Sequence, residues 1–299
     1  MKKYSKQQSQ TKKFFRSYAD EWQSKAADDV YSVINDRHTA VFETLKKIKK
    51  GSAVLDVGCG AGHLAIDLDL KGYNAIGVDF ADEMIQLANA NKKNKKSKAN
   101  FYNSSIYDFD IPRNISLFTA MGFIEYVSQD ELKKILKFFY KNLSDTGYIS
   151  IGSRNRLFNL CSFNSFTIQE IELNTIQNLL EENIIISNSK SKDQMIMNLR
   201  SHENSLSHPE YHPTTKIDVE KRYQYTPSEL IKVIEREGFV VENIFPIHFH
   251  AFNPNISEIE LLNHRKRISG LISDSYQNQF KLIPNSSAFV IEAKKKCSK

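Results

Sequence analysis

The run from Val54 to Gly62 holds the residues whose types and spacing most clearly predict chemistry. It reads Val-Leu-Asp-Val-Gly-Cys-Gly-Ala-Gly, an apolar stretch that leads directly into three glycines at alternate positions. Glycine has no Cβ, so the backbone can turn tightly there and a ligand can lie against main-chain N–H groups at the start of the next helix. The run predicts a cofactor site that includes Asp56, Gly58, Gly60 and Gly62.

A second carboxylate follows one strand and one helix later. Asp79 ends the next apolar run, where a carboxylate is placed to accept hydrogen bonds from the two hydroxyls of a ribose. The dinucleotide fingerprint G-x-G-x-x-G would need a glycine at the position of His63, and Gly62 comes one residue too early for it. The spacing counts against a nicotinamide cofactor, and an NAD(P)-dependent oxidoreductase stays open as the alternative.

The elements that must position these residues alternate along the first half of the chain. Apolar runs predict strands at 53–57, 74–78, 100–102, 115–120 and 148–152, and helical periodicity predicts helices at 62–70, 81–91 and 130–142. Helices are also expected within 14–50. This order predicts an α/β fold: a Rossmann-like, doubly wound, mostly parallel seven-stranded sheet with an antiparallel edge strand and N-terminal helices.

The alternation breaks between residues 153 and 223, which are rich in Asn, Ser and His. We interpret this stretch as an inserted cap over the site. Thr226, Pro227 and Glu229 then give a strong helix start, followed by strands near 240–249 and 287–293 and a helix near 257–277. The expected organisation is a helical lid (1–50), a cofactor-binding core (51–152), the cap (153–223) and a completion of the core sheet (224–299).

The glycine loop and its two flanking carboxylates resemble the first two motifs of class I S-adenosylmethionine-dependent methyltransferases. The resemblance covers 53–152 well and 226–293 more loosely. It implies S-adenosylmethionine as cofactor and S-adenosylhomocysteine as product. It also implies that Asp79 binds the ribose hydroxyls, and that Phe80 and Met84 flank the adenine. Ordinary helix packing is the alternative for Met84.

Further parts of the resemblance concern the rest of the cofactor. The family often carries an Asp where this chain has Ser105, and the resemblance implies that Ser105 and the backbone of Ile106 lie at the adenine edge. The main chain around Met121 is implied to pass the sulfonium. The segment 18–22 resembles the lid helix of the ubiquinone-biosynthesis type, in which an arginine reaches the cofactor's carboxylate; Arg37 is the candidate here.

Methyl transfer is a displacement at the sulfonium carbon, so the protein supplies alignment and, for a hydroxyl acceptor, proton removal. Histidine suits that second task. His248 and His250 lie two residues apart on an expected strand, so they should share one side, and we predict them as catalytic residues. A structural role for either, or a metal site with a cap histidine, stays open, although no ordered ligand spacing supports a metal and none is expected.

The identity of the methyl acceptor is the property that the sequence specifies least. The start of the cap, 153–159, together with the His-Phe-His run at 248–250, resembles methyltransferases of bacterial surface-glycan and secondary-metabolite gene sets. That resemblance implies O-methylation of a sugar or sugar-linked small molecule. No Asn/Asp-Pro-Pro-aromatic motif follows the fourth strand, which counts against a nucleic-acid methyltransferase. That alternative would depend on the lysine runs at 92–98 and 294–299.

Composition agrees with a small-molecule partner. The formal net charge is +6 over 299 residues, which is mild, and its lysine runs are typical of solvated faces rather than of a nucleic-acid footprint. The three cysteines form no C-x-x-C pair, which predicts a reducing, cytoplasmic setting. We expect neither a secretory signal nor a membrane span.

Overall fold

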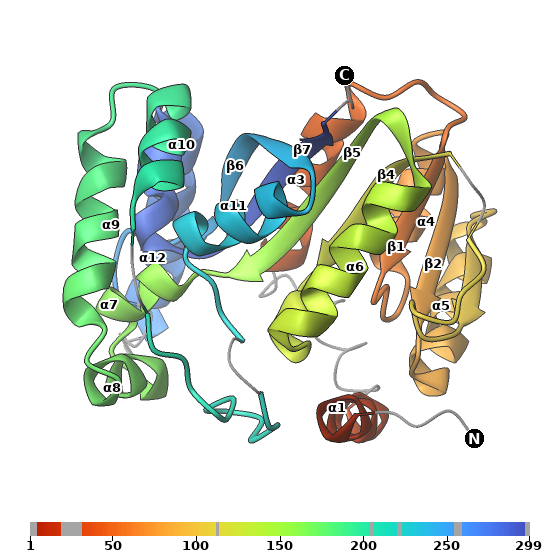
Figure 1. Ribbon diagram of the computed structural model, residues 1–299, viewed down its shortest axis with the longest axis horizontal. Helices are drawn as coiled ribbons and strands as arrows, with labels where there is room; N and C mark the ends of the chain where they lie inside the picture. The colour runs from red at the N-terminus through yellow and green to blue at the C-terminus, as the bar shows by residue number, and fades with distance from the viewer. Residues whose placement is uncertain are drawn as a thin grey trace.

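A seven-stranded sheet forms the centre of the computed structural model (Figure 1), which describes residues 5–18, 32–111, 114–203, 206–219, 223–253 and 259–296. Its strand order is β3-β2-β1-β4-β5-β7-β6. Neighbours from β3 to β5 pair in parallel, and β7 pairs antiparallel with both β5 and β6. The strands are β1 (Ala53–Val57), β2 (Asn74–Asp79), β3 (Asn100–Asn103), β4 (Ile115–Met121), β5 (Leu143–Arg154), β6 (Phe239–Phe249) and β7 (Ser286–Lys295).

The central strands are apolar because helices cover both faces of the sheet. Figure 1 shows one helix layer in front of the sheet and another behind it. Strands buried on both faces become nearly continuous apolar runs, as in β4, where Ile115, Leu117 and Phe118 are fully buried. The helices are α1 (Lys6–Ser17), α3 (Ser32–Leu45), α4 (His63–Leu70), α5 (Asp82–Lys95), α6 (Gln129–Asn142), α7 (Asn159–Ser162), α8 (Ser165–Glu172), α9 (Ile176–Asn188), α10 (Lys192–Ser201), α11 (Pro227–Arg236) and α12 (Ile259–Ser275).

The strand order reverses between β1 and β4. Chain connections run outward from β1 through β2 to β3, and in the other direction from β4 to β5. In an open α/β sheet the crevice at the carboxyl ends of the strands on either side of such a reversal is where ligands bind. The glycine loop follows β1 directly, so the fold places it at this crevice.

The predicted fold class is confirmed, with differences at particular elements. The antiparallel strand β7 lies one position inside the sheet, and β6 forms the edge. The first helix begins at Lys6 rather than at residue 14, because Ser5 and Gln8 form a capping box, in which each side chain bonds the other's backbone N–H. Trp22, part of the expected lid helix, lies outside the described residues.

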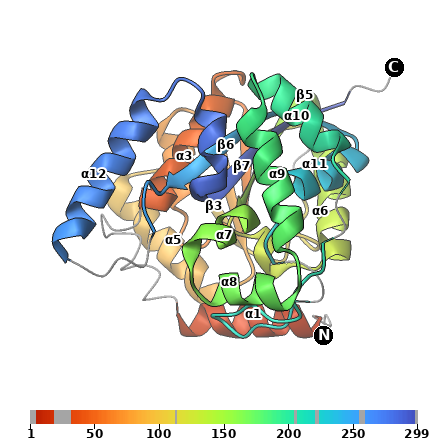
Figure 2. The same cartoon turned by 90° about the vertical axis from the view of Figure 1, so that its left-hand side faces the viewer.

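The helices within 153–223 form a group at one end of the sheet, to the left in Figure 1 and at the front in Figure 2. Leu179, Ile186, Met195 and Leu199 belong to the same apolar cluster as the residues of β5 and α11. This helical part of the segment therefore continues the main core. The domain boundaries stay a prediction.

The later part of this segment reaches α1. The backbone N–H of Asp218 donates to Oε1 of Gln10 at 2.8 Å, and Nε2 of Gln10 lies 3.3 Å from the Asp218 carboxylate. Lys6 also pairs with Asp218. Residues 206–219 therefore connect the segment to the N-terminal helix.

A buried ion pair holds the start of this segment. The guanidinium of Arg156 is 2% exposed, and it donates to both carboxylate oxygens of Glu170 at 2.9 to 3.1 Å. The amide of Asn159 donates to the same carboxylate at 2.7 Å, and Nη1 of Arg156 lies 3.0 Å from Nδ1 of His208. These bonds fix the turn after β5 to α8.

Glu182 on α9 is fully buried and accepts two hydrogen bonds from Ser228, at 2.8 Å from its N–H and 2.7 Å from its hydroxyl. Burial raises the pKa of Glu182 from its ordinary 4.5 to about 7. Below pH 4.5 the carboxyl is protonated in both the folded and the unfolded chain. Between pH 4.5 and about 7 the unfolded chain ionises first, so this group lowers the free energy of unfolding as the pH rises.

Glu182→Gln removes this titration. Because a pKa unit corresponds to about 1.4 kcal/mol, we expect the variant to gain on the order of 3 kcal/mol relative to the wild type between pH 4 and pH 8. Urea unfolding of both proteins across that range measures the difference. If the free energies of unfolding of the two proteins change in parallel with pH, the pKa of the buried Glu182 is not raised.

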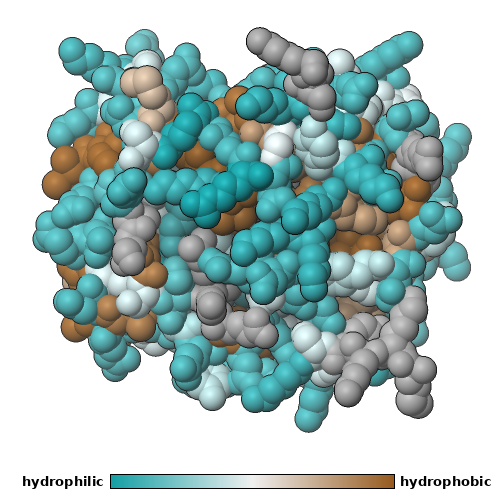
Figure 3. Space-filling view, viewed as in Figure 1, coloured by the Kyte–Doolittle hydropathy of each residue, from teal (hydrophilic) through white to brown (hydrophobic). Residues whose placement is uncertain are grey.

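The outer surface is mostly hydrophilic, as Figure 3 shows for one face. Apolar side chains interrupt it on the left, where Figure 1 places α9 and α10, and Leu180, Ile184 and Met197 on these helices are exposed. Across the described ranges, every helix is too short or too polar to span a bilayer.

Candidate functional site

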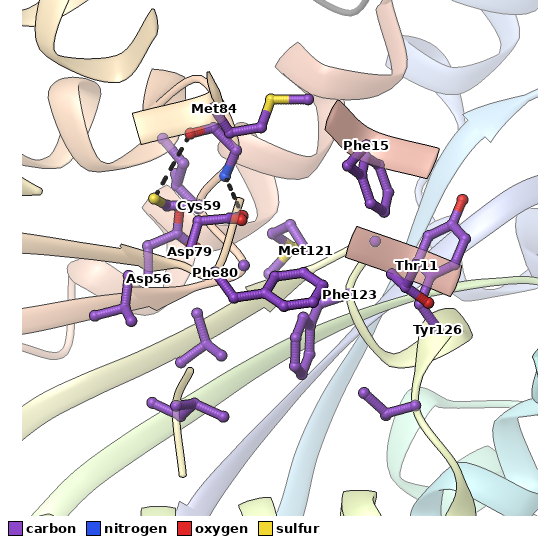
Figure 4. Close-up of a pocket in the computed structure, with 18 of the residues that line it drawn as sticks. Thr11, Phe15, Asp56, Cys59, Asp79, Phe80, Met84, Met121, Phe123 and Tyr126 are labelled. Carbon is purple, nitrogen blue, oxygen red and sulfur yellow. Dashed lines mark hydrogen bonds between the residues drawn. The ribbon is translucent and has the colours of Figure 1, made fainter. Parts of the chain in front are cut away.

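One cavity opens at the carboxyl ends of β1, β2 and β4 (Figure 4). Its walls come from α1, α3, the glycine loop, the end of β2 and the loops after β3 and β4. It brings together all of the predicted cofactor residues except Gly62: Arg37, Asp56, Gly58, Gly60, Asp79, Phe80, Met84, Ser105, Ile106 and Met121.

The backbone conformation of the glycine loop favours residues without a Cβ. Gly58, Gly60 and Gly62 have φ of +67°, +52° and +79°, a region that other residues rarely adopt. A Cβ at Gly60 would have no described atom within 4 Å, so it would project into the open side of the loop. The backbone of Gly60 is therefore free for close approach by a ligand.

Gly62 serves packing rather than the cavity. It is the residue before α4, and a Cβ there would lie 2.5 Å from the ring of Phe101 and 2.9 Å from Ala88. In the dinucleotide fingerprint the third glycine allows this kind of close packing. Here Gly62 does so, one residue before His63.

Asp79 joins the glycine loop to the end of β2. Its Oδ2 accepts the N–H of Gly60 at 3.0 Å and its Oδ1 accepts the N–H of Ala81 at 2.9 Å. Burial raises the pKa of Asp79 in spite of these bonds. Each carboxylate oxygen has a further lone pair, so this side chain fits a ribose diol while the backbone holds it in place.

Asp56 supports the loop from below. Its Oδ1 accepts the hydroxyl of Thr119 at 2.6 Å, across the β1–β4 pairing. Burial raises the pKa of Asp56 to about 7, the Thr119 hydrogen bond opposes this, and the Asp79 charge adds to it. The bond fixes the ends of β1 and β4 relative to each other, which positions the loop between them.

The adenine side combines lining and packing. Met84 lines the cavity but is 3% exposed and packs with Ala81 and Phe15. Figure 4 shows Phe80 reaching across the middle of the cavity toward Phe123. Both readings of Met84, packing and contact with a ligand, are therefore compatible with its position.

Arg37 on α3 lies against the loop after β4. Its Nη1 would be 2.8 Å from a Cβ at Gly122, and its buried Nε has no hydrogen-bond partner among the described residues. Burial lowers the pKa of Arg37, while the charge of Glu125 opposes that shift. A buried guanidinium with a free donor at a cavity wall fits an anionic group such as the cofactor's carboxylate.

Glu125 is a cavity residue that the sequence analysis missed. It is 4% exposed and its Oε2 lies 2.9 Å from Nε of Arg154 and 3.6 Å from Nε2 of His212. Burial alone would raise the pKa of Glu125, but Arg154, His212 and Arg37 together hold it below its ordinary value. The cavity therefore contains a buried, ionised carboxylate.

His38 was also missed, although it directly follows Arg37. It is buried, lines the cavity, and its Nδ1 lies 2.7 Å from Oδ2 of Asp67. A carboxylate on one ring nitrogen orients the imidazole and supports a positive charge on it. This pair is a geometry suited to a proton acceptor.

His248 and His250 do not line the cavity. Their rings lie 4.2 Å apart, but His248 Nδ1 is 3.1 Å from the hydroxyl of Ser287, and His250 stacks on Phe158 at 4.8 Å. The two rings are neighbours although His248 has φ of +55° and β6 ends at Phe249, so that His250 lies just after the strand. Their catalytic role stays a prediction.

The fold and this site define a class of protein. The reversal point of the sheet carries a glycine loop, a carboxylate at the next strand end and a buried arginine, which together fit a nucleoside joined to an amino acid. A family model described as a methyltransferase domain matches residues 54–147. Residues 54–147 are thus similar to the methyltransferase domain, and the site that they form fits S-adenosylmethionine.

Sequence relatives are distant and partial. A ubiquinone biosynthesis O-methyltransferase of Rickettsia conorii is 27% identical over 117 residues, which is 39% of this chain and 40% of the relative. An uncharacterized methyltransferase of Alkaliphilus oremlandii is 24% identical over 179 residues, 56% of this chain and 79% of the relative. The chain spans 40% to 50% of the length of the first ubiquinone-biosynthesis relatives it matches.

Solved structures share the fold at low identity. The 1,6-didemethyltoxoflavin-N1-methyltransferase of Burkholderia thailandensis, bound to S-adenosylhomocysteine, matches with a TM-score of 0.58 and 11% identity, covering 97% of this chain and 88% of that one. The magnesium protoporphyrin IX methyltransferase of Synechocystis PCC 6803 matches with a TM-score of 0.54 and 12% identity, covering 95% and 99%. These likenesses show the fold.

Proposed function

We propose that this chain transfers the methyl group of S-adenosylmethionine to a hydroxyl of a polar small molecule, with a sugar or sugar-linked compound as the acceptor class. One observation carries the proposal. The cavity runs from Asp56 and Asp79 at one end to Thr11 and Tyr126 at the other (Figure 4), and Glu125 lies beside Tyr126. The far end offers both aromatic faces and hydrogen-bonding groups, which suits the apolar faces and polar edge of a sugar ring.

The near end of the cavity binds the cofactor in this proposal. Asp79 accepts the ribose hydroxyls, the backbone at Gly60 allows close approach of the ligand, and Arg37 pairs with the carboxylate. S-adenosylmethionine supplies an electrophilic methyl carbon on a sulfonium. The protein's part is to align the acceptor oxygen with that carbon and to exclude water from the cavity.

An acceptor hydroxyl loses its proton as the new C–O bond forms and the S–CH3 bond breaks. We assign the role of proton acceptor to His38, because His38 lines the cavity and Asp67 orients its ring. His248 and His250, which the sequence favoured, remain the competing assignment. The Rickettsia relatives are ubiquinone biosynthesis O-methyltransferases, which agrees with an oxygen acceptor.

Replacing His38 by glutamine tests this assignment. We expect the kcat to fall about 100-fold, since general base catalysis typically contributes this much, while the Kd of S-adenosylhomocysteine changes little. His248→Gln and His250→Gln are the matched controls and should retain most of the kcat. If His38→Gln stays active and either control variant loses about 100-fold in kcat, the base is His248 or His250 instead.

The function itself is tested by acceptor-dependent turnover. The protein is incubated with S-adenosylmethionine and a panel of free sugars, nucleotide sugars, phenols, amines and short nucleic acids, and release of S-adenosylhomocysteine is followed. We expect turnover with a saccharide, and mass spectrometry of the product should place the methyl group on oxygen. Turnover with nucleic acid or with amines alone would contradict the proposed acceptor.

A further inference from the structure

The helix α1 buries polar atoms that have no hydrogen-bond partner among the described residues. Gln7 and Thr11 are each 4% exposed, and Nε2 and Oε1 of Gln7 and Oγ1 of Thr11 are all unpaired within that part of the chain. Other side chains of α1 are paired: Gln8 donates to Glu131 at 2.6 Å. Natural proteins satisfy nearly all buried polar groups, so an entire buried amide without partners indicates a ligand.

The helical spacing locates these atoms. Gln8, Thr11 and Phe15 line the cavity, whereas Lys6 and Gln10 face Asp218 of the 206–219 segment. With 3.6 residues per turn, position 7 lies between these two faces of the helix and one turn before Thr11. Gln7 does not itself line the cavity, and this spacing places it between the cavity face of α1 and the 206–219 segment, a boundary that we call the seam. Figure 4 shows Thr11 beside Tyr126 at this end of the cavity.

A row of rings continues the seam into the segment. Phe15 meets Tyr126 edge-on at 5.0 Å, and Tyr126 stacks on His212 at 6.0 Å. His212 is fully buried, and the backbone N–H of Thr215 lies 3.2 Å from its Nδ1. Because Nδ1 accepts that bond, the neutral ring carries its proton on Nε2.

The Nε2 atom of His212 also has no hydrogen-bond partner among the described residues. Nε2 of His212 lies 3.6 Å from Oε2 of Glu125, longer than a normal hydrogen bond. A second set of polar atoms thus lies next to the unpaired groups of α1, with Tyr126 between them. Arg154 already contacts Glu125 at 2.9 Å, so the carboxylate is paired within the protein and needs no cation from a ligand.

We propose that Gln7 and Thr11 form a binding subsite for neighbouring hydroxyls of a neutral saccharide, closed by α1. A glutamine amide both donates and accepts, and so does a threonine hydroxyl, which matches the donor and acceptor of each sugar hydroxyl. The unpaired groups of Gln7 and Thr11 are neutral, which favours hydroxyls over an anionic group as their partners. The ligand is the methyl acceptor only if the proposed function holds, but the subsite can be tested without it.

The test uses three simple probes, the methyl glycosides of glucose, mannose and rhamnose. Each is added at millimolar concentration to the protein saturated with S-adenosylhomocysteine, and binding is followed by saturation-transfer NMR. At least one glycoside should bind the wild type. The double variant Gln7→Leu/Thr11→Val, which keeps the side-chain sizes, should bind it at least tenfold more weakly, and Gln177→Leu, on an exposed face of α9, should bind it normally.

Two further readouts separate the outcomes. Thermal unfolding of the double variant should be unchanged or raised, because it removes unpaired buried polar atoms; a large fall in Tm would mean that Gln7 and Thr11 serve the fold and would overturn the subsite. If S-adenosylhomocysteine binds but no glycoside does, or if the double variant binds glycosides as well as the wild type, the subsite is wrong. If S-adenosylhomocysteine itself does not bind, the proposed function fails as well.

Discussion

Asp79→Asn is expected to weaken the binding of S-adenosylhomocysteine by about 100-fold. Both oxygens of Asp79 already accept backbone N–H groups, from Gly60 and Ala81. An asparagine amide would place N–H against one of those donors, so the loop and strand end would separate, and one ribose hydroxyl would lose its acceptor. Hydrogen bonds to charged groups contribute about 1.5 to 3 kcal/mol each, which makes a loss of about two orders of magnitude reasonable.

Isothermal titration calorimetry with S-adenosylhomocysteine measures this loss directly. Asp82→Asn is the matched control, since Asp82 lies three residues later, at the start of α5, and pairs with Arg16 at the surface. It should bind the ligand within about threefold of the wild type, because exposed ion pairs contribute little. Equal affinities for the wild type and Asp79→Asn would show that the ribose is bound elsewhere.

Breaking the buried pair of Arg156 and Glu170 is expected to have the largest effect on stability. Arg156→Met leaves the Glu170 carboxylate buried without its guanidinium, with Asn159 and Thr175 as its remaining hydrogen-bond donors. Removing one partner of a buried pair typically costs about 3 to 5 kcal/mol, mainly because the other charge is stranded. Urea unfolding at neutral pH should show a loss of this size for the single variant.

The double variant Arg156→Met/Glu170→Leu distinguishes a stranded charge from lost packing. We expect it to recover a large part of the stability that Arg156→Met loses, because no charge stays buried. A double variant that is less stable than the single one would show that the network of Asn159, His208 and the ion pair shapes the turn after β5 in a way that apolar groups cannot replace.

The parts of the site that the sequence predicted are those made by local backbone geometry. A glycine loop after an apolar run, and a carboxylate at the next strand end, occupy fixed places in a parallel sheet. Gly58, Gly60 and Asp79 accordingly meet at the cavity as expected. Strand periodicity likewise located most of the sheet, although β5 begins at Leu143, earlier than its apolar core alone indicated.

The parts that the sequence missed depend on contacts between distant segments. His38 belongs to the site because α3 packs beside α4, where Asp67 lies. Glu125 is ionised because Arg154 and His212 converge on it from two other segments. Neither residue stands in a local pattern that would single it out.

His248 and His250 lie beside each other but outside the lining of the cavity. Spacing of two along a strand is a sound rule only while the backbone remains extended, and His248 is in the left-handed region. Its N–H is held by Asp36, from α3, at 3.2 Å. A hydrogen bond from a distant segment accompanies the turn of the chain there, and residue spacing alone does not reveal it.

The identity of the cofactor is the claim on which the rest depends, and a calorimetric comparison of two ligands tests it most directly. S-adenosylmethionine and NADH are titrated separately into the same protein. We expect saturable binding of S-adenosylmethionine at one site per chain, lost in Asp79→Asn, and no heat of binding with NADH. Binding of NADH without binding of S-adenosylmethionine would contradict the account.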